Sequence, residues 1–122
     1  MAQHNELGRK GENLAKTHLQ NAGYEIMDEN WTDPRLEVDL IAYKDKVIIF
    51  TEVKTRTGNG FNEPEDFVDA RKQKLLVEAA DEYIYLMNHQ GEVRFDIGSA
   101  LFDKKNNYIL KHIEDAFWPS TL

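Results

Sequence analysis

The chain has 122 residues, of which 41% are hydrophobic, so we expect a globular protein with a single domain over residues 1–122. It contains no cysteine and no apolar run of membrane-spanning length, which excludes disulfides, thiolate metal sites and a transmembrane helix, and we expect a cytoplasmic location. The net charge is −7 and neither half of the chain is basic, so a surface that binds nucleic acid has to be local.

The first predicted element is an amphipathic helix from Asn5 to about Gly23, in which apolar or small residues recur every three or four positions. Gly11 lies on its inner face and indicates close packing against another element. Glu12 falls near the border of the apolar stripe, so its carboxylate either points toward a neighbouring sheet or is an ordinary solvated acid. His18 lies inside the stripe and is expected to be a core residue whose ring nitrogens have hydrogen-bond partners.

Three antiparallel strands are predicted next. Residues 24–31 alternate as a strand does, and a turn follows at residues 32–35. The runs 36–43 and 47–54 are rich in β-branched and aromatic residues, and a short polar turn at residues 44–46 joins them. This pattern predicts a β-hairpin near the middle of a sheet.

Three charged side chains interrupt this apolar hairpin. Asp39 lies in its first strand, and Glu52 and Lys54 follow the apolar part of the second. Glu52 and Lys54 share a face, and a suitable register would place the Asp39 carboxylate beside that of Glu52. Two close carboxylates repel unless a cation lies between them, and hard oxygen ligands suit Mg²⁺ or Mn²⁺. The alternative interpretation is a solvated strand face without chemistry.

The second half of the chain begins with a predicted mobile loop at residues 55–66, which is either a substrate-contacting lid or a plain connector. Asp69 is expected to cap a second helix that runs to about Asn88, with Gly91 just beyond its end. Its predicted buried stripe comprises Leu75, Leu76, Ala79, Ala80, Tyr83, Ile84 and Met87.

Basic residues cluster in the first turns of this helix, at Arg71, Lys72 and Lys74. Cations at a helix N-terminus oppose the helix dipole, so their position requires a reason. Two reasons remain open. The cluster contacts a phosphate, or it pairs with the acidic residues of the preceding loop, which are Glu63, Glu65 and Asp66.

Two further strands are predicted at residues 92–101 and 108–113, joined by a turn at residues 103–107. Arg94 and Asp96 share a face of the first of these strands and are candidates to pair with each other. The tail, residues 114–122, has no clear period and is expected to pack back on the core or to contact a partner.

Five motifs occur in the order seen in the YraN-like family, a group of small bacterial proteins similar to archaeal Holliday-junction resolvases. They are Gly11-Glu12-x-x-Ala15, the run 37–42 (EVDLIA), the run 50–56 (FTEVKTR), the run 71–74 (RKQK) and the run 94–96 (RFD). Asp39 followed by Glu52-x-Lys54 resembles the PD-(D/E)xK signature of the restriction-endonuclease-like superfamily. The chain departs from the family at Leu36, where glycine is common.

The resemblance implies an α/β fold with a restriction-endonuclease-like core, in which helices flank a mixed central β-sheet in the order α-β-β-β-α-β-β. It also implies a metal-dependent nuclease. Asp39 and Glu52 would ligate Mg²⁺ or Mn²⁺, with the carbonyl of Val53 and with Glu12 completing the shell, and Lys54 would orient the attacking water or stabilise the phosphate. These residues are the candidate catalytic and metal-binding set.

The nucleic-acid partner implied by the resemblance is DNA, with branched or structured DNA as the favoured substrate. Arg56, Arg71 and Lys74 would hold flanking phosphates, and a homodimer would suit a symmetric junction. The alternative is a nucleic-acid-binding or protein-interaction module on the same fold with little or no turnover. The overall acidity favours this alternative, whereas the acidic cluster, which a plain scaffold has no reason to keep, speaks against it.

Overall fold

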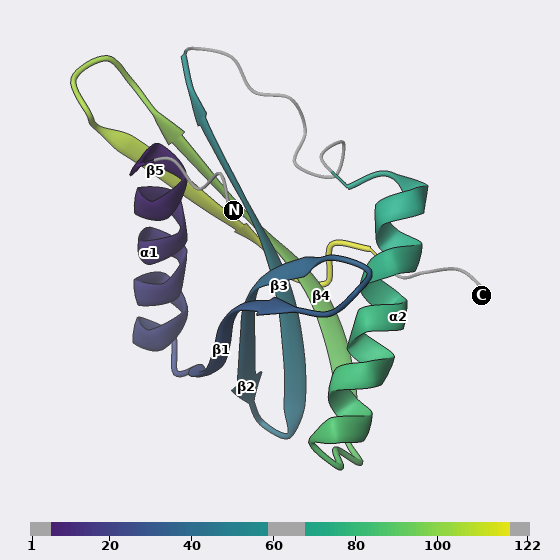
Figure 1. The fold of residues 1–122 in the computed structure, drawn as a ribbon. Helices are drawn as coiled ribbons and strands as arrows, with labels where there is room; N and C mark the ends of the chain where they lie inside the picture. The colour runs from purple at the N-terminus through teal and green to yellow at the C-terminus, as the bar shows by residue number, and fades with distance from the viewer. Residues whose placement is uncertain (1–5, 59–67, 118–122) are drawn as a thin grey trace.

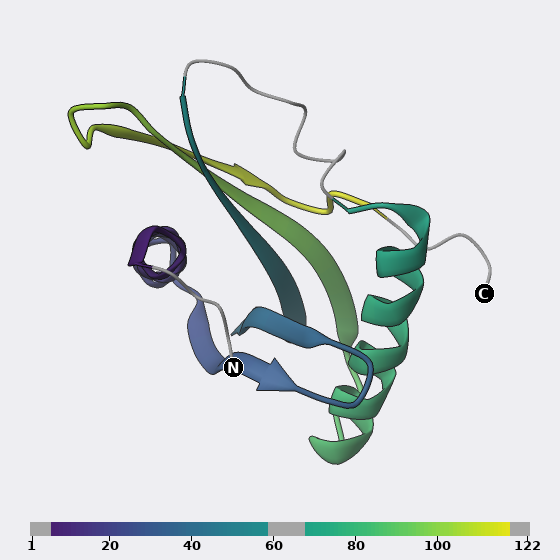
Figure 2. The same cartoon turned by 45° about the horizontal axis from the view of Figure 1, so that its top comes forward.

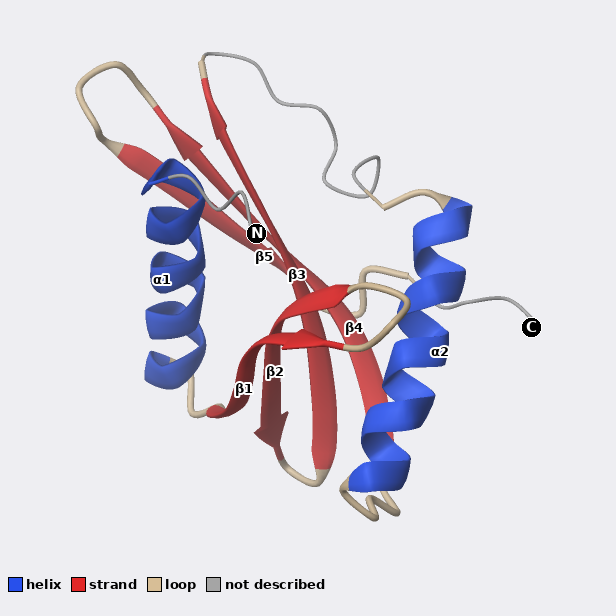
Figure 3. Ribbon diagram, in the orientation of Figure 1, coloured by secondary structure: helices blue, strands red, loops and turns tan. Residues whose placement is uncertain are grey.

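The computed structural model describes residues 6–58 and 68–117 and contains two helices and a five-stranded sheet (Figures 1 and 3). The elements are α1 (Glu6–Asn21), β1 (Glu25–Thr32), β2 (Glu37–Lys44), β3 (Val47–Thr57), α2 (Ala70–Leu86), β4 (Glu92–Phe102) and β5 (Tyr108–Ile113). The strands lie side by side in chain order, with β3 and β4 parallel and all other neighbours antiparallel. The predicted α/β class, the mixed sheet and the element order are confirmed. Within the described residues neither helix is long and apolar enough to cross a membrane.

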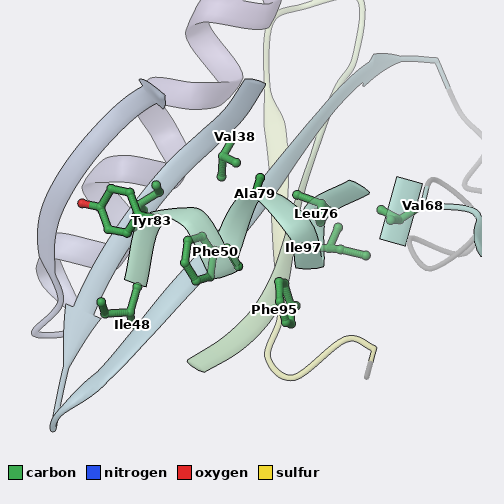
Figure 4. Close-up of a cluster of buried hydrophobic side chains, with 11 residues drawn as sticks. Val38, Ile48, Phe50, Val68, Leu76, Ala79, Tyr83, Phe95 and Ile97 are labelled. Atoms are coloured by element: carbon green, nitrogen blue, oxygen red, sulfur yellow. The ribbon is translucent and has the colours of Figure 1, made fainter. Parts of the chain in front are cut away.

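The sheet separates two hydrophobic clusters because its strands alternate. In β3, Phe50 faces α2, whereas Ile49 and Val53 face α1. Figure 2 shows the two helices on opposite sides of the sheet. The α2 cluster, drawn in Figure 4, comprises Val38, Ile41, Ile48, Phe50, Val68, Leu76, Ala79, Ala80, Tyr83, Phe95 and Ile97. The smaller cluster under α1 comprises Ala15, Leu19, Tyr24, Leu40, Ala42, Ile49 and Val53.

Helix α1 lies directly on β3 at a glycine. A Cβ atom at Gly11 would come within 2.0 Å of Oγ1 of Thr55, so no side chain fits between helix and strand there. The helix ends at Asn21, and the predicted terminating residue Gly23 follows it with a φ of +93°, a conformation that glycine adopts without strain. The expected close approach of Gly11 is therefore confirmed, and it fixes where Glu12 lies relative to the sheet.

Helix α2 begins as predicted and ends at Leu86, within two residues of the predicted end near Asn88. The Asp69 side chain caps it by accepting a hydrogen bond from the backbone N–H of Lys72 at 2.9 Å. The residue that takes the left-handed conformation after the helix is Asn88, with a φ of +53°. Gly91 therefore does not terminate the helix. Met87, predicted to be buried, is 48% exposed because it follows the last turn of the helix.

Strand β3 is longer than predicted. The expected loop was to begin at Thr55, but the strand continues to Thr57 because it pairs in parallel with β4 as far as Phe102. Residues 59–66 of that predicted loop lie outside the described residues, as do residues 118–122 of the tail. The described part of the tail packs on the core through Phe117, whose ring stacks on Phe95 with a centroid separation of 5.3 Å.

The β1–β2 hairpin leaves the sheet at one end. The ladder between β2 and β3 stops at the Leu40–Thr51 pair, whereas β1 and β2 stay paired with each other beyond that point. Both views show this end of the hairpin reaching α2 (Figures 1 and 2), and there the Trp31 and Tyr83 rings meet edge to face with centroids 5.1 Å apart. A fork therefore opens between β2 and β3, with α2 beside it.

Candidate functional site

Asp39 and Glu52, the two acids of the predicted hairpin formed by β2 and β3, lie at this fork. Asp39 and Glu52 are the next residues outward from the last Leu40–Thr51 pair. Where the backbone ladder stops, Oδ2 of Asp39 accepts a hydrogen bond from the backbone N–H of Val53 at 2.7 Å. The register that the prediction required is present, and it brings the two carboxyl groups together.

The Asp39 carboxyl is held in an unfavourable environment for a negative charge. Its burial and the neighbouring Glu52 carboxylate raise the pKa of Asp39 to about 8, with a smaller contribution from Glu12. The hydrogen bond from Val53 and the positive charge of Lys72 act in the opposite direction but do not outweigh these effects. Asp39 therefore lacks enough positive charge around it to stay ionised at neutral pH.

The Glu52 carboxylate is only partly satisfied. The residue is 6% exposed, and its Oε2 lies 2.5 Å from Nζ of Lys72 and 3.5 Å from Nζ of Lys54. Its Oε1 is buried and has no hydrogen-bond partner among the described residues. A buried carboxylate oxygen without a partner is costly, so a ligand that binds there would gain favourable free energy.

Glu12 approaches the two acids from α1 but does not join them. Its Oε1 accepts a hydrogen bond from Nδ2 of Asn30 at 3.3 Å, and its negative charge is near enough to contribute to the raised pKa of Asp39. Within residues 6–58 and 68–117, no three His, Asp or Glu side chains converge closely enough to hold a metal ion as they stand. Glu12 would therefore have to move to complete a shell.

The donor set nevertheless fits a divalent cation of the hard type. It offers carboxylate oxygens from Asp39 and Glu52, one of them without a partner, and a carboxyl group whose ionised form needs more positive charge than the protein supplies. Mg²⁺ and Mn²⁺ prefer such ligands and are commonly held by one or two carboxylates. Val53 follows Glu52 on β3 and is buried, and its backbone N–H donates a hydrogen bond to Oδ2 of Asp39.

Lys72 is a site residue that the sequence interpretation missed. The prediction assigned its neighbours Arg71 and Lys74 to phosphates and left Lys72 outside the site. On α2, however, Lys72 precedes the buried residues Leu76 and Ala79 by four and seven positions. At helical spacing it therefore belongs to the face that covers the sheet, and this was the signal that could have identified it.

The three predicted phosphate contacts lie near the site but not in it. Arg71 and Lys74 are exposed on the first turns of α2, and Arg56 is exposed two positions beyond Lys54 on β3. The acidic loop residues that were the alternative partners of the basic cluster lie outside the described residues. The contact seen for the cluster is the one between Lys72 and Glu52.

A second buried acid, Asp96, lies on the opposite, α1 side of the sheet. Its oxygens accept hydrogen bonds from Nε and Nη2 of Arg94 at 2.9 and 2.8 Å and from the Asp115 backbone N–H at 2.9 Å. Nε2 of His112 lies 2.8 Å from its Oδ2. Burial alone would raise the pKa of Asp96, but these partners outweigh burial and hold it below its usual value.

This arrangement confirms the predicted pairing of Arg94 with Asp96. It also corrects the prediction for His18, which is exposed instead of lying in the core. Its Nε2 does have a partner, because it lies 3.2 Å from Nδ1 of His112. The helix turns this position toward the edge of its apolar stripe, where the ring reaches β5 and remains in contact with solvent.

Comparison with known proteins places the chain in a family. Residues 11–99 match the Uncharacterised protein family UPF0102. A UPF0102 protein of Flavobacterium psychrophilum is 42% identical over 118 residues, which cover 97% of this chain and 98% of the relative. One of Bacteroides thetaiotaomicron is 42% identical over 98% of each chain, and one of Chlorobium chlorochromatii is 38% identical over 93% of this chain and 92% of the relative. These names assign no activity, and they support the family membership that the motifs indicated: the protein belongs to the uncharacterised protein family UPF0102.

Proposed function

We propose that this protein is a metal-dependent nuclease with a restriction-endonuclease-like core that hydrolyses phosphodiester bonds in DNA. The observation that carries the proposal is the half-satisfied, buried Glu52 carboxylate beside Asp39, with Lys54 on the same face of β3. A purely structural acid in this position would be expected to have all its oxygens paired. The element order and the acid-x-Lys spacing agree with the PD-(D/E)xK signature.

In this proposal the chain's own residues divide the work. Asp39 and Glu52 hold Mg²⁺ or Mn²⁺, with the carbonyl of Val53 as a third ligand and Glu12 completing the shell after a side-chain movement. When bound, the ion polarises the phosphate and lowers the pKa of the attacking water. Lys54, whose ammonium is 3.5 Å from Glu52, orients that water or stabilises charge on the phosphate.

The proposed substrate contacts are electrostatic. Arg56, Arg71 and Lys74 are exposed cations that lie within two positions of Lys54 or Lys72 in the chain, and they would bind phosphates without reading the base sequence. Because the whole chain carries a net charge of −7, binding depends on this local patch and on the metal. Branched or structured DNA is the proposed substrate class, and a homodimer would match a symmetric junction.

A second candidate function is a nucleic-acid-binding or protein-interaction module with little or no turnover. One observation favours it. Lys72 already neutralises Glu52 at 2.5 Å, so the site has a cation of its own without a metal. A protein that had lost its metal would be stabilised by such a contact.

The proposal is tested by cleavage of labelled single-stranded, duplex, flap and four-way-junction DNA, with single-stranded RNA of the same sequence, in Mg²⁺ and separately in Mn²⁺. We expect metal-dependent cleavage of at least one DNA substrate, and we expect Glu52→Gln to abolish it. Glu92→Gln is the matched control, because it makes the same chemical change at an exposed position at the start of β4.

The outcomes separate the two functions. Cleavage that survives in Glu52→Gln would come from another site or a contaminant and would refute the proposed chemistry. If neither protein cuts any substrate in either metal, while the wild type binds the same DNA panel, the binding module is the better description. Cleavage of the RNA alone would keep the chemistry and replace the proposed substrate.

A further inference from the structure

We infer that Lys72 is an internal counter-ion of Glu52. In the metal-free protein its ammonium supplies the positive charge that a bound divalent cation would supply, and it has to leave this carboxylate when the metal binds. The inference rests on the proposed function, because it concerns the same carboxylates. It adds a residue outside the acid-x-Lys motif and assigns it an effect on metal affinity. Its prediction is that the metal competes with a side chain of the protein itself.

The contact has the properties that such a competition requires. Nζ of Lys72 lies 2.5 Å from Oε2 of Glu52, whereas the lysine of the motif, Lys54, is 3.5 Å away from the same atom. The closer cation therefore comes from α2 and not from β3. An ion bound to the same carboxylate would stand beside this ammonium, and two adjacent cations repel each other.

The Lys72 backbone is held by the start of the helix, whereas its side chain reaches the surface. Its backbone N–H donates to the Asp69 cap at 2.9 Å, and Nε2 of the next residue, Gln73, donates to the carbonyl of Val68 at 3.1 Å. These bonds fix the first turn of α2. The Lys72 side chain is 30% exposed, so its flexible four-carbon stem can turn outward into solvent without any change in the helix.

The protein has a reason to keep such a counter-ion. Glu52 is 6% exposed and lies beside a second carboxyl group, so the metal-free fold would otherwise contain a buried negative charge without compensation. Lys72 removes that penalty. The same ion pair must be broken before the metal binds, and breaking it reduces the observed affinity for the metal.

The test is the affinity for Mn²⁺ measured by isothermal titration calorimetry, with thermal unfolding in the presence of a chelator. We expect Lys72→Met to bind Mn²⁺ about tenfold more tightly than the wild type, or better, and to melt at a lower temperature when no metal is present. Lys74→Met is the matched control, since it removes the same charge from an exposed position one half-turn further along α2. It should leave both quantities near their wild-type values.

Three outcomes overturn the inference, and they differ in what they leave standing. If the wild type and Lys72→Met bind Mn²⁺ equally, Lys72 does not compete, although the proposed metal site survives. If Lys74→Met tightens binding as much as Lys72→Met, the effect is a general change of charge. If neither protein binds Mn²⁺, the proposed metal site fails together with the inference.

A second variant guards against a loss of folding. Lys72→Gln removes the charge but keeps a polar side chain with a hydrogen-bond donor, so it is expected to fold if Lys72→Met does not. Circular dichroism of each variant in the chelator verifies the fold. Tighter Mn²⁺ binding by Lys72→Gln supports the inference in the same way, and unchanged binding refutes it.

Discussion

Replacing Asp39 by asparagine is expected to stabilise the metal-free protein at neutral pH and to remove its response to metal. The pKa of this carboxyl is about 8 in the folded protein. In an unfolded chain it is about 3.9. Between these two values the folded state holds a proton that the unfolded state releases, so the contribution of Asp39 to stability is present below about pH 4 and is lost as the pH rises toward 8.

The magnitude follows from this difference. Each pH unit in the interval weakens the fold by roughly 1 kcal/mol, so the wild type should lose on the order of 2 to 3 kcal/mol relative to Asp39→Asn between pH 5 and pH 7. Asparagine does not titrate, and its side-chain oxygen can still accept the hydrogen bond from Val53. The variant should therefore match the wild type near pH 4 and exceed it in stability by a growing margin above that pH.

The assay is urea unfolding of both proteins in a chelator at intervals from about pH 4 to about pH 9, with the difference in unfolding free energy plotted against pH. Asp81→Asn, which removes an exposed carboxylate of α2, is the control and should give a flat difference. A flat difference for Asp39→Asn as well, or a variant less stable than the wild type at pH 8, would refute the account of this carboxyl. Millimolar Mn²⁺ should then raise the melting temperature of the wild type and not that of Asp39→Asn.

Two other substitutions test the frame around the site by denaturant unfolding. Gly11→Ala should destabilise the protein by about 1 to 3 kcal/mol because its Cβ would lie 2.0 Å from Oγ1 of Thr55. Adding Thr55→Ala to the same chain should restore most of the lost stability. Equal stability of the wild type and Gly11→Ala would contradict the contact. Asp96→Asn should cost about 3 kcal/mol because it leaves the Arg94 guanidinium beside His112 without its carboxylate. The depressed pKa of Asp96 adds stability above the unfolded pKa that is lost as the pH falls through the folded value, so the cost of Asp96→Asn should shrink in acid, and a cost that grows in acid would contradict this.

The fold was predictable because its signals are local. Alternation and turn residues marked each strand, and the three- and four-residue spacing marked each helix. What failed was the end of β3, which depends on a distant partner. Thr57 belongs to β3 because β4 continues alongside it, and nothing between Thr55 and Gly58 announces that pairing. Helix α2 ends at Leu86, within two residues of its predicted end, and the left-handed residue that follows it is Asn88.

The approach of the two acids was predictable only in part. Its register depends on the turn between β2 and β3, where Asp45 and Lys46 have φ values of +52° and +68°. A two-residue turn of this kind makes Asp39 and Glu52 opposite each other, whereas one extra residue would have moved one of them to another position. The dipeptide lacks the glycine that usually marks such a turn, so the sequence left the register open. The contact of Lys72 with Glu52 was harder still to predict, because it depends on how α2 lies across the sheet.

The difference between the two buried acids of the sheet could not have been read from the sequence. Glu52 and Asp96 both interrupt apolar strands, and each has a basic residue two positions away, Lys54 and Arg94. Both oxygens of Asp96 have partners, which is what a charge kept for stability requires. Oε1 of Glu52 has none among the described residues, although it too is buried. Composition and spacing cannot supply that distinction, because it depends on which other strands and helices reach each carboxylate. An acid whose partners come entirely from the protein has little left to bind, whereas an acid left with one buried oxygen unpaired has a place for a ligand, and this contrast is why Glu52 and not Asp96 is the centre of the proposed site.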